Sequence, residues 1–414
     1  MRSEQNELSI IHPVCCGIDV HKEMLVACVL KQTEKGNISE IKEFRTFSKD
    51  LKELLSWLKG HSCPVVSMES TGVYWRPVHN VLEGEVEVIL INARHYKNVP
   101  GKKTDISDSK WIANLLQHGL LKGSYIPPSH QREWRELCRA RKKTVKTIAD
   151  YKRRTHKVLE TANIKIDSVA SDLFCKTGKK LMDYLCEEKK LTQEGVDHRC
   201  FGSLRSKSSE LWEAINGFFT DHTRYLLQLN RKIVEFLEAE KLNLTKRIES
   251  LMEDHSELIE KLIQIPGIQK ESAQSILGEI GETLDNFKNA DVLCSWAGVC
   301  PGNKESAGKR YSGRSPVRKH VLKEILIECS WAAVKKKKSF YRAKYYRLKA
   351  KRGAKKAIVA IAHKLLKAIY SIIKTKTEYI ELGENYLPNI QKKSLKILKK
   401  QALSLGYELK KIAV

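Results

Sequence analysis

The sequence predicts a chain of mixed architecture, in which an α/β domain is followed by mainly helical domains. Three observations support this expectation. Short strand-like and helical segments alternate before residue 130, long segments with helical periodicity follow them, and the positive charge lies almost entirely in the helical part. The 414 residues, 42% of them hydrophobic, are enough to form two or three cores, which excludes wholesale disorder.

The first domain is expected over residues 1–128. Its predicted elements are strands at 14–20, 25–30 and 41–47, a helix at 49–59, a strand at 64–69, a helix at 75–82, a strand at 86–91, and a helix through Trp111, Ile112 and Leu115. Tight turns between the first three strands indicate antiparallel neighbours. The order of three strands, helix, strand, helix, strand and helix is that of a ribonuclease-H-like α/β domain.

The rest of the chain is predicted to be mainly helical. Long helices at 131–165 and 208–255 have heptad-like apolar positions, and we expect a helical spacer or coiled coil over 129–256, a candidate dimer interface. A third, mainly helical domain is expected over 257–375, followed by a basic helical tail over 376–414.

The third domain is expected to contain a loop over 298–316. It also contains a glycine-rich turn. The segment Ile265-Pro266-Gly267-Ile268 lies between two apolar-periodic segments, which is the pattern of a helix-hairpin-helix. Such a turn can present backbone N–H groups to a phosphate. An ordinary helical hairpin is an equally good interpretation.

The charge is segregated along the chain. The net charge is +26, but residues 1–130 carry only +1, whereas 131–157 carry +8 and 301–360 carry +16. Such density favours a polyanion, because each Lys or Arg on a phosphate releases counterions. The basic residues expected to contact nucleic acid are Arg141, Lys142, Lys143, Lys309, Arg310, Arg314, Arg318, Lys335, Lys336, Lys337 and Lys338.

Two alternatives exist for any one basic run, a solvated helix face and an anionic membrane surface. Aromatic residues are interleaved with the last run, and such residues can stack on unpaired bases, which favours nucleic acid. They are Trp331, Phe340, Tyr341, Tyr345 and Tyr346.

Several classes of protein are excluded by what the sequence lacks. No stretch approaches the roughly 18 to 20 apolar residues that cross a bilayer, and no signal peptide is apparent, so a cytoplasmic location is expected. The eleven cysteines form no C-x-x-C pair, and we expect reduced structural thiols. Cys294, Cys300 and His320 fit no common zinc spacing.

Four carboxylates in the first domain form the candidate catalytic and metal-binding set. Asp19 lies in a predicted central strand, where a buried aspartate is costly unless it is paired or binds a cation. Glu69 ends the fourth strand, and Asp105 and Asp108 share one helix face at i and i+3. Such a set can hold two Mg²⁺ ions, about 3.5 to 4 Å apart, for phosphoryl transfer. Singly, the last three have structural explanations, so only the set is specific.

These segments resemble a known family, the DEDD transposases of bacterial insertion elements of the insertion-sequence-110 type. The N-terminal resemblance is carried by GIDVHK at 17–22, MESTGVYW at 68–75, NAR at 92–94 and KTDISD at 103–108. The C-terminal one is carried by IPGI at 265–268, SWAG at 295–298 and GKR at 308–310. Together they cover roughly 14–120 and 258–375. The resemblance implies a RuvC-like domain in which Asp19, Glu69, Asp105 and Asp108 bind Mg²⁺, within a bacterial, nucleoid-associated recombinase.

The resemblance also implies a serine nucleophile, a guide and an assembly. In the family the serine lies in a Ser-Ser-Gly-Gly-like stretch ahead of Lys or Arg, which corresponds here to 305–309, with Glu305 and Ala307 departing from the pattern. Ser306 is therefore the candidate, with Ser312 and Ser315 as alternatives. Members are directed to donor and target DNA by a structured bridge RNA, and they act as dimers that pair into tetramers.

Two other functions remain open besides a transposase that cuts and rejoins DNA. One is a hydrolytic nuclease such as a junction resolvase, in which the carboxylates activate water without a covalent intermediate. The other is a non-catalytic nucleic-acid-binding protein. A covalent protein–DNA adduct separates the first function from the second, and loss of metal-dependent activity without Asp19 separates both from the third.

Overall fold

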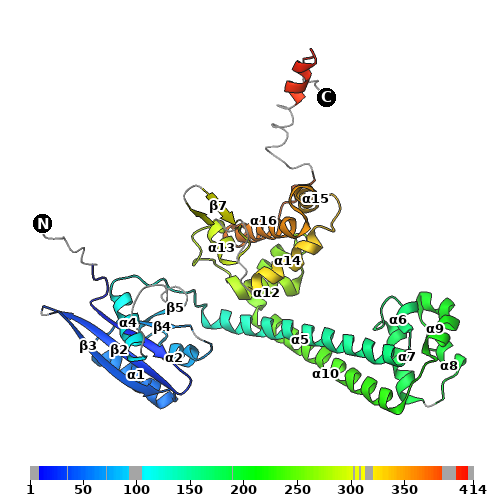
Figure 1. The fold of residues 1–414 in the computed structure, drawn as a ribbon, viewed down its shortest axis with the longest axis horizontal. Helices are drawn as coiled ribbons and strands as arrows, with labels where there is room; N and C mark the ends of the chain where they lie inside the picture. The colour runs from blue at the N-terminus through cyan, green and yellow to red at the C-terminus, as the bar shows by residue number, and fades with distance from the viewer. Residues whose placement is uncertain are drawn as a thin grey trace. The chain divides into compact units, whose positions relative to one another are not determined.

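A five-stranded mixed sheet lies at the centre of the first unit of the chain, Met1–Pro127 (Figure 1). The computed structural model describes residues 9–34, 36–70, 72–92, 105–188, 190–301, 304–306, 309–312, 320–384 and 398–408. The strands of this unit are β1 (Val14–Val20), β2 (Met24–Thr33), β3 (Gly36–Arg45), β4 (Val65–Glu69) and β5 (Glu87–Ile91), and its helices are α1 (Ser48–Gly60), α2 (Trp75–Leu82) and α4 (Asp105–Gln117).

The sheet has the strand order β3-β2-β1-β4-β5. The pairs β1–β2 and β2–β3 are antiparallel, whereas β1–β4 and β4–β5 are parallel. This is an α/β ribonuclease-H-like domain, as the sequence predicts. Two strands differ in their bounds, because β2 ends at Thr33 instead of residue 30 and β3 begins at Gly36 instead of residue 41. The difference is larger for β3. Most of its residues are exposed at the sheet edge, so their alternation is weak in the sequence.

Helices cover both faces of the sheet. Cys16 and Ile18 of β1 point into a core that also contains Leu54 and Leu58 of α1. The intervening residue Cys15 packs instead with residues of α4, because successive side chains of a strand point to opposite faces. The faces of β1 are therefore distinct, with α1 and α2 on one and α4 on the other.

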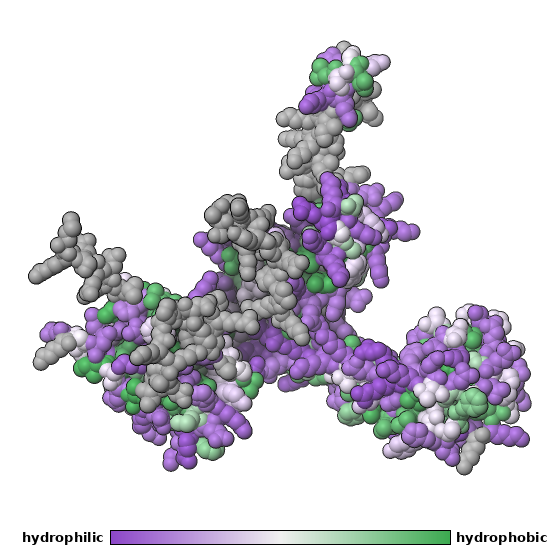
Figure 2. All heavy atoms as spheres, viewed as in Figure 1, coloured by the Kyte–Doolittle hydropathy of each residue, from purple (hydrophilic) through white to green (hydrophobic). Residues whose placement is uncertain are grey.

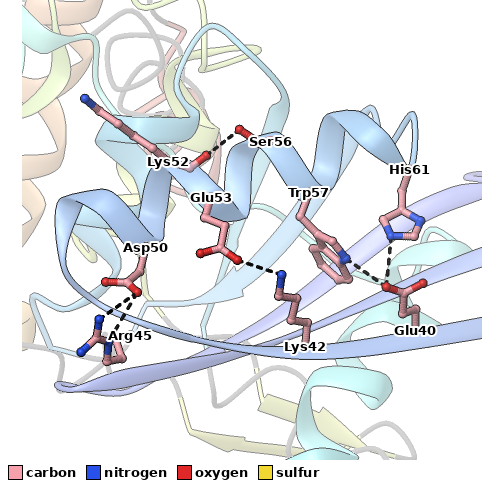
Figure 3. Close-up of polar contacts among 9 residues, drawn as sticks. All are labelled: Glu40, Lys42, Arg45, Asp50, Lys52, Glu53, Ser56, Trp57 and His61. Carbon is pink, nitrogen blue, oxygen red and sulfur yellow. Dashed lines mark hydrogen bonds and ion pairs between the residues drawn. The ribbon is translucent and has the colours of Figure 1, made fainter.

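Polar contacts also hold α1 against the edge strand β3 (Figure 3). Trp57 Nε1 donates to Glu40 Oε1 at 3.0 Å, and His61 Nε2 lies 3.4 Å from the same oxygen. Lys42 Nζ donates to Glu53 Oε1 at 2.9 Å. Glu40 and Lys42 of β3 therefore pair with residues of the same unit.

The second unit, Pro128–Val414, contains two long helices that pack against each other, α5 (Ser129–Thr161) and α10 (Asp221–Leu251) (Figure 1). Between them the chain forms α6 (Ile166–Val169), α7 (Lys176–Glu187), α8 (Gln193–Asp197), the 3₁₀ helix η1 (Gly202–Lys207) and α9 (Ser208–Ile215). These elements share a core with the end of α5 and the start of α10.

The helix predicted over 208–255 is wrong in one respect, because the chain breaks between α9 and α10. A Cβ on Gly217 would lie 2.3 Å from the backbone oxygen of Ala162, so the glycine permits the break to pack on the end of α5. The break between α9 and α10 depends on this close contact, and the apolar pattern of the sequence does not reveal it.

A second helical module follows α10 and packs on the first half of α5. Its elements are the 3₁₀ helix η2 (Glu253–His255), α11 (Ser256–Ile263), α12 (Lys270–Ile280), α13 (Ala290–Trp296), β6 (Lys304–Ser306), β7 (Lys309–Ser312), α14 (Val321–Ala333), α15 (Phe340–Arg352) and α16 (Ala354–Thr375). Its core includes Trp134 and Cys138 of α5. Within the described residues, every helix is too short or too polar to span a bilayer.

The glycine-rich turn joins α11 and α12 as a helical hairpin. Gly267 has a positive φ of 85°, and a Cβ there would lie 2.3 Å from the backbone oxygen of Cys329 in α14. The turn is therefore packed against another helix. This close approach explains the glycine without a bound phosphate.

Candidate functional site

Two carboxylates lie near the carboxyl ends of neighbouring parallel strands of the first sheet. β1 pairs with β4 so that Ile18 lies opposite Met68, and the next residues along the two strands are Asp19 and Glu69. Parallel strands present their carboxyl ends at the same edge, and adjacent strands are about 4.8 Å apart. The register of the sheet therefore brings Asp19 and Glu69 side by side.

A glycine in β1 brings α4 close to these carboxylates. A Cβ on Gly17 would lie 2.2 Å from the backbone oxygen of Ser109 and 2.4 Å from the backbone nitrogen of Ala113. Residues two apart in a strand share a face, so Asp19 projects from the face that α4 covers. Asp108 directly precedes Ser109 and lies on this side of the sheet.

The surroundings of Asp19 include acidic neighbours. Burial raises the pKa of Asp19 above its ordinary value, the contact with His21 opposes that effect, and the charges of Asp108 and Glu69 raise the pKa further. The sheet register and the close approach of α4 put these residues on one side of the sheet. We call Asp19, Glu69 and Asp108 the acidic cluster.

The chemistry of this cluster fits a hard divalent cation. Its donors are carboxylate oxygens from two strand ends and a helix, and Asp19 is only 9% exposed. Among the side chains that the structure describes, no group of three or more His, Cys, Asp or Glu is placed to hold a metal ion. Asp105 begins α4 one turn before Asp108, and its side chain lies outside the described residues. Asp19, Glu69 and Asp108, with Asp105, could hold Mg²⁺.

His21 also belongs to this site, although its position in the sequence does not predict a role. Its Nε2 lies 3.1 Å from Asp19 Oδ2, and its side chain is 56% exposed. The signal in the sequence is the spacing of two residues at the end of a strand, which puts both side chains on one face. The contact fixes the orientation of the Asp19 carboxylate.

The candidate serine lies in a β-hairpin, where a loop is predicted over 298–316. β6 and β7 are antiparallel, with Ser306 opposite Lys309 and Glu305 opposite Arg310. Such short, polar strands have no apolar alternation that could predict them. The side chains of residues 302–319 are outside the described part of the chain. For Arg314, Ser315 and Arg318 the backbone is outside it as well.

Both ends of the hairpin segment are anchored to the core of the module. Val299 is buried on one side, and Leu322 is buried on the other. The rings of Trp296 and His320 meet edge to face with centroids 4.4 Å apart. The fixed ends restrict where the hairpin, and with it Ser306, can lie.

The basic candidates in α5 differ in their surroundings. Arg141 is only 3% exposed and donates to Gln274 Oε1 at 2.9 Å and to the backbone oxygen of Glu271 at 3.0 Å. Lys142 Nζ lies 3.1 Å from Glu324 Oε2. These two residues stabilise the packing of α5 against α12 and α14, which directs their charges into the protein, whereas Lys143 is exposed.

The basic candidates after α14 are at the surface. The lysine run, residues 335–338, forms the connection between α14 and α15, and all four side chains are exposed. No Asp or Glu occurs between residues 329 and 377. On the face shown in Figure 2, hydrophilic residues predominate around α15. This surface, unlike Arg141, is available to an anionic partner.

Two family models match the chain. A DEDD model of the IS110 type, described as a transposase, matches residues 16–164, and a model described as the transposase IS116/IS110/IS902 family matches residues 259–347. The first match contains the acidic cluster and the second contains the β6–β7 hairpin. Comparison with curated proteins gave no match. The two models together cover more than half of the chain and confirm the resemblance, so the chain belongs to the IS110-type DEDD transposases and is a DNA transposase.

Proposed function

We propose that this transposase cuts and rejoins DNA with a serine nucleophile and a divalent metal bound by the acidic cluster. The observation that carries the proposal is the register of the sheet, which places Asp19 next to Glu69 on the face that α4, with Asp108, covers. A buried, ionised aspartate among other acids opposes folding, so a functional role explains it better than a structural one.

The residues of the first unit have separate tasks in this proposal. Asp19, Glu69, Asp105 and Asp108 would hold Mg²⁺, two ions in our proposal, and His21 would orient Asp19. Gly17 lets α4 approach, which sets the position of Asp108. A bound divalent ion would stabilise the negative charge that develops on the phosphate oxygens.

Ser306 is proposed as the nucleophile. Its Oγ attacks a DNA phosphodiester, the bond between phosphorus and the deoxyribose oxygen breaks, and the proton of the serine hydroxyl is transferred to that leaving oxygen. The phosphoserine ester conserves the bond energy for rejoining to another strand. Lys309, opposite Ser306 in the hairpin, and Arg310 supply positive charge for the phosphate.

The second unit is proposed to bind the nucleic acids. Donor and target DNA and a structured guide RNA would contact Lys143, the lysine run and the hairpin residues Lys309 and Arg310, with Arg314 and Arg318 beyond them. The guide RNA rests on the family resemblance alone. We propose four functional parts, which are a catalytic domain (1–128), a spacer (129–256), a serine-bearing domain (257–375) and a basic tail (376–414).

The proposed assembly is a homodimer that pairs into a tetramer. α10 carries exposed apolar side chains along its length, among them Tyr225 and Phe236, each 63% exposed. A second copy of the chain would cover them, as in other helical pairings. Sedimentation of the wild type and of a Tyr225→Lys, Phe236→Lys double variant tests this assembly. The wild type should be oligomeric and the variant should dissociate, and a monomeric wild type would contradict the proposal.

Metal dependence of strand transfer tests the catalytic proposal. Asp19→Asn should abolish strand transfer in Mg²⁺ and weaken Mn²⁺ binding measured by calorimetry, while leaving DNA affinity nearly unchanged. Asp50→Asn is the matched control, because it makes the same change on α1, where Asp50 pairs with Arg45 (Figure 3). Strand transfer at the wild-type rate in Asp19→Asn would contradict the assignment.

The alternative function is hydrolysis by the acidic cluster, with the second unit only gripping DNA. The cluster supports it, because carboxylates that bind a metal are sufficient to activate water. The two functions differ in the chemistry at the serine. Product ends formed by water without any protein–DNA adduct would favour the nuclease.

A further inference from the structure

We propose that α14 and α15 carry a stacking site for unpaired bases of single-stranded DNA, formed by Trp331 and Tyr346. The proposal rests on the DNA-handling function of this transposase and is independent of the serine nucleophile. It assigns a ligand class to a surface that would otherwise be described only by its charge.

The two rings are exposed and held by a buried one. Trp331, near the end of α14, is 43% exposed, and Tyr346 of α15 is 51% exposed. Both contact Tyr345, which is only 5% exposed, with ring centroids 5.8 Å apart for Trp331 and 5.3 Å apart for Tyr346. Tyr345 therefore contacts both exposed aromatic side chains, so their ring centroids are at most about 11 Å apart and their apolar faces meet water.

Cations flank the Tyr346 ring. The Arg342 guanidinium lies 5.2 Å from the ring centroid, and Lys349 Nζ lies 5.8 Å from it. Arg342 Nη1 also lies 3.5 Å from the backbone oxygens of Val334 and Lys335, so it connects α15 to the end of α14 and to the lysine run. A base stacked on Tyr346 would have positive charge available for the phosphates on either side of it.

The electrostatic surroundings favour a polyanion over a neutral ligand. α15 contains six Lys and Arg residues and no Asp or Glu. Burial lowers the pKa of Lys344, and the neighbouring charges of Lys364 and Arg347 lower it further. Such charge alone would suit any phosphate backbone. The exposed rings add a requirement, because only unpaired bases offer their faces for stacking, whereas a duplex buries them.

Affinity measurements with single-stranded and duplex DNA test the site. With the full chain and a thymidine oligonucleotide of about 15 nucleotides, Trp331→Leu and Tyr346→Leu should each weaken binding by about 5- to 150-fold. Leucine keeps apolar area but has no aromatic face. Affinity for a duplex of equal length and the salt slope should not change, because no charge is removed.

Two further variants control the experiment. Tyr346→Phe should retain wild-type affinity for the single strand, because the phenyl ring still stacks. Phe47→Leu is the matched control, since Phe47 is 65% exposed with Arg45 5.3 Å from its ring, but it lies in the first unit. It should leave binding unchanged. Thermal melting checks that each variant is folded, and Trp331→Phe replaces any variant that is not.

Three outcomes would overturn the stacking site. They are no loss in either leucine variant, equal losses for single-stranded and duplex DNA, and stacking-dependent binding of a uridine RNA oligonucleotide but not of DNA. Failure of the wild type to bind any DNA would instead count against the proposed nucleic-acid role of the second unit. The two failures are therefore distinguishable.

Discussion

Gly17 shows how one small residue builds the acidic cluster. The backbone of α4 passes so close to β1 that a Cβ at this position would overlap the backbone of Ser109 and Ala113. Because backbone atoms cannot rotate away, any larger residue must move the whole helix. Asp108 would move with it, so the geometry of the cluster depends on a residue that carries no chemistry.

Gly17→Ala tests this dependence. The variant should lose strand transfer and be destabilised by about 1–3 kcal/mol, because it forces α4 away from the sheet. Gly60→Ala is the matched control, since nothing lies within 4 Å of a Cβ at the end of α1. That variant should be neutral or slightly more stable. Urea unfolding measures both, and equal stabilities for the two variants would contradict the packing argument.

The burial of Asp19 should make the stability of the fold depend on pH. Burial is the largest cause of its raised pKa, so the folded protein holds the Asp19 proton more tightly than the unfolded chain does. Ionised Asp19 therefore opposes folding at neutral pH, and this penalty is relieved as pH falls through the raised pKa toward the ordinary value of 3.8.

Without divalent metal, Asp19→Asn should melt at a higher temperature than the wild type at pH 7. The difference should shrink as the pH falls toward the ordinary pKa, because protonated Asp19 is as neutral as asparagine. Thermal melting of both proteins over a pH series measures it. A variant that is less stable than the wild type at pH 7 would show that Asp19 stabilises the fold.

At the scale of elements, two basic segments of the sequence have different uses. In α5, Arg141 is buried and Arg139 donates to both carboxylate oxygens of Glu279, at 2.7 and 2.9 Å. The lysine run is exposed and precedes α15. A count of charges cannot separate these cases, because burial depends on partners that lie far away in the chain.

Arg141→Ala should therefore destabilise the protein by about 1–3 kcal/mol, because it leaves Gln274 Oε1 and the Glu271 carbonyl without this donor. It should not change the salt dependence of nucleic-acid binding. Lys143→Ala, on the exposed side of the same helix, is the control and should keep wild-type stability. A flattened salt slope in Arg141→Ala would contradict the internal role.

Neutralising the lysine run should have the opposite effect. Alanine at residues 335–338 should preserve the melting temperature, because the side chains are exposed. Affinity should fall about equally for all DNA sequences, and the slope of log K against log salt should flatten by roughly 0.7 to 0.9 for each phosphate that the variant no longer neutralises. An unchanged slope would show that the run is only a solvated surface.

Elements that bury one apolar face can be predicted from the sequence, whereas elements fixed by distant contacts cannot. The apolar alternation of β1 and the leucine stripe of α1 predict those elements, because each buries one face in a core. The β6–β7 hairpin has no such face, and the break at Gly217 depends on contact with a distant carbonyl. Asp19 and Glu69 could be proposed from their strands, whereas Gly17 and His21 required the packed structure.

At the scale of the whole molecule, charge and chemistry are divided between the two units. The first unit contains the acidic cluster and lacks the excess positive charge, which would compete with a metal ion for the carboxylates. The second contains the hairpin with Ser306 and nearly all of the excess positive charge. In the proposed mechanism, strand transfer requires both units, and a hydroxyl of the second unit forms the covalent bond to DNA.

Mapping of a covalent adduct shows whether Ser306 forms this bond. Protein incubated with cognate DNA and Mg²⁺ should give a denaturation-resistant adduct whose mapped peptide contains Ser306, and Ser306→Ala should eliminate both adduct and product while DNA binding survives. Ser312→Ala, at the far end of β7, is the matched control and should keep the adduct. Cleavage that continues in Ser306→Ala, Ser312→Ala and Ser315→Ala alike, with ends made by water, would contradict the covalent mechanism.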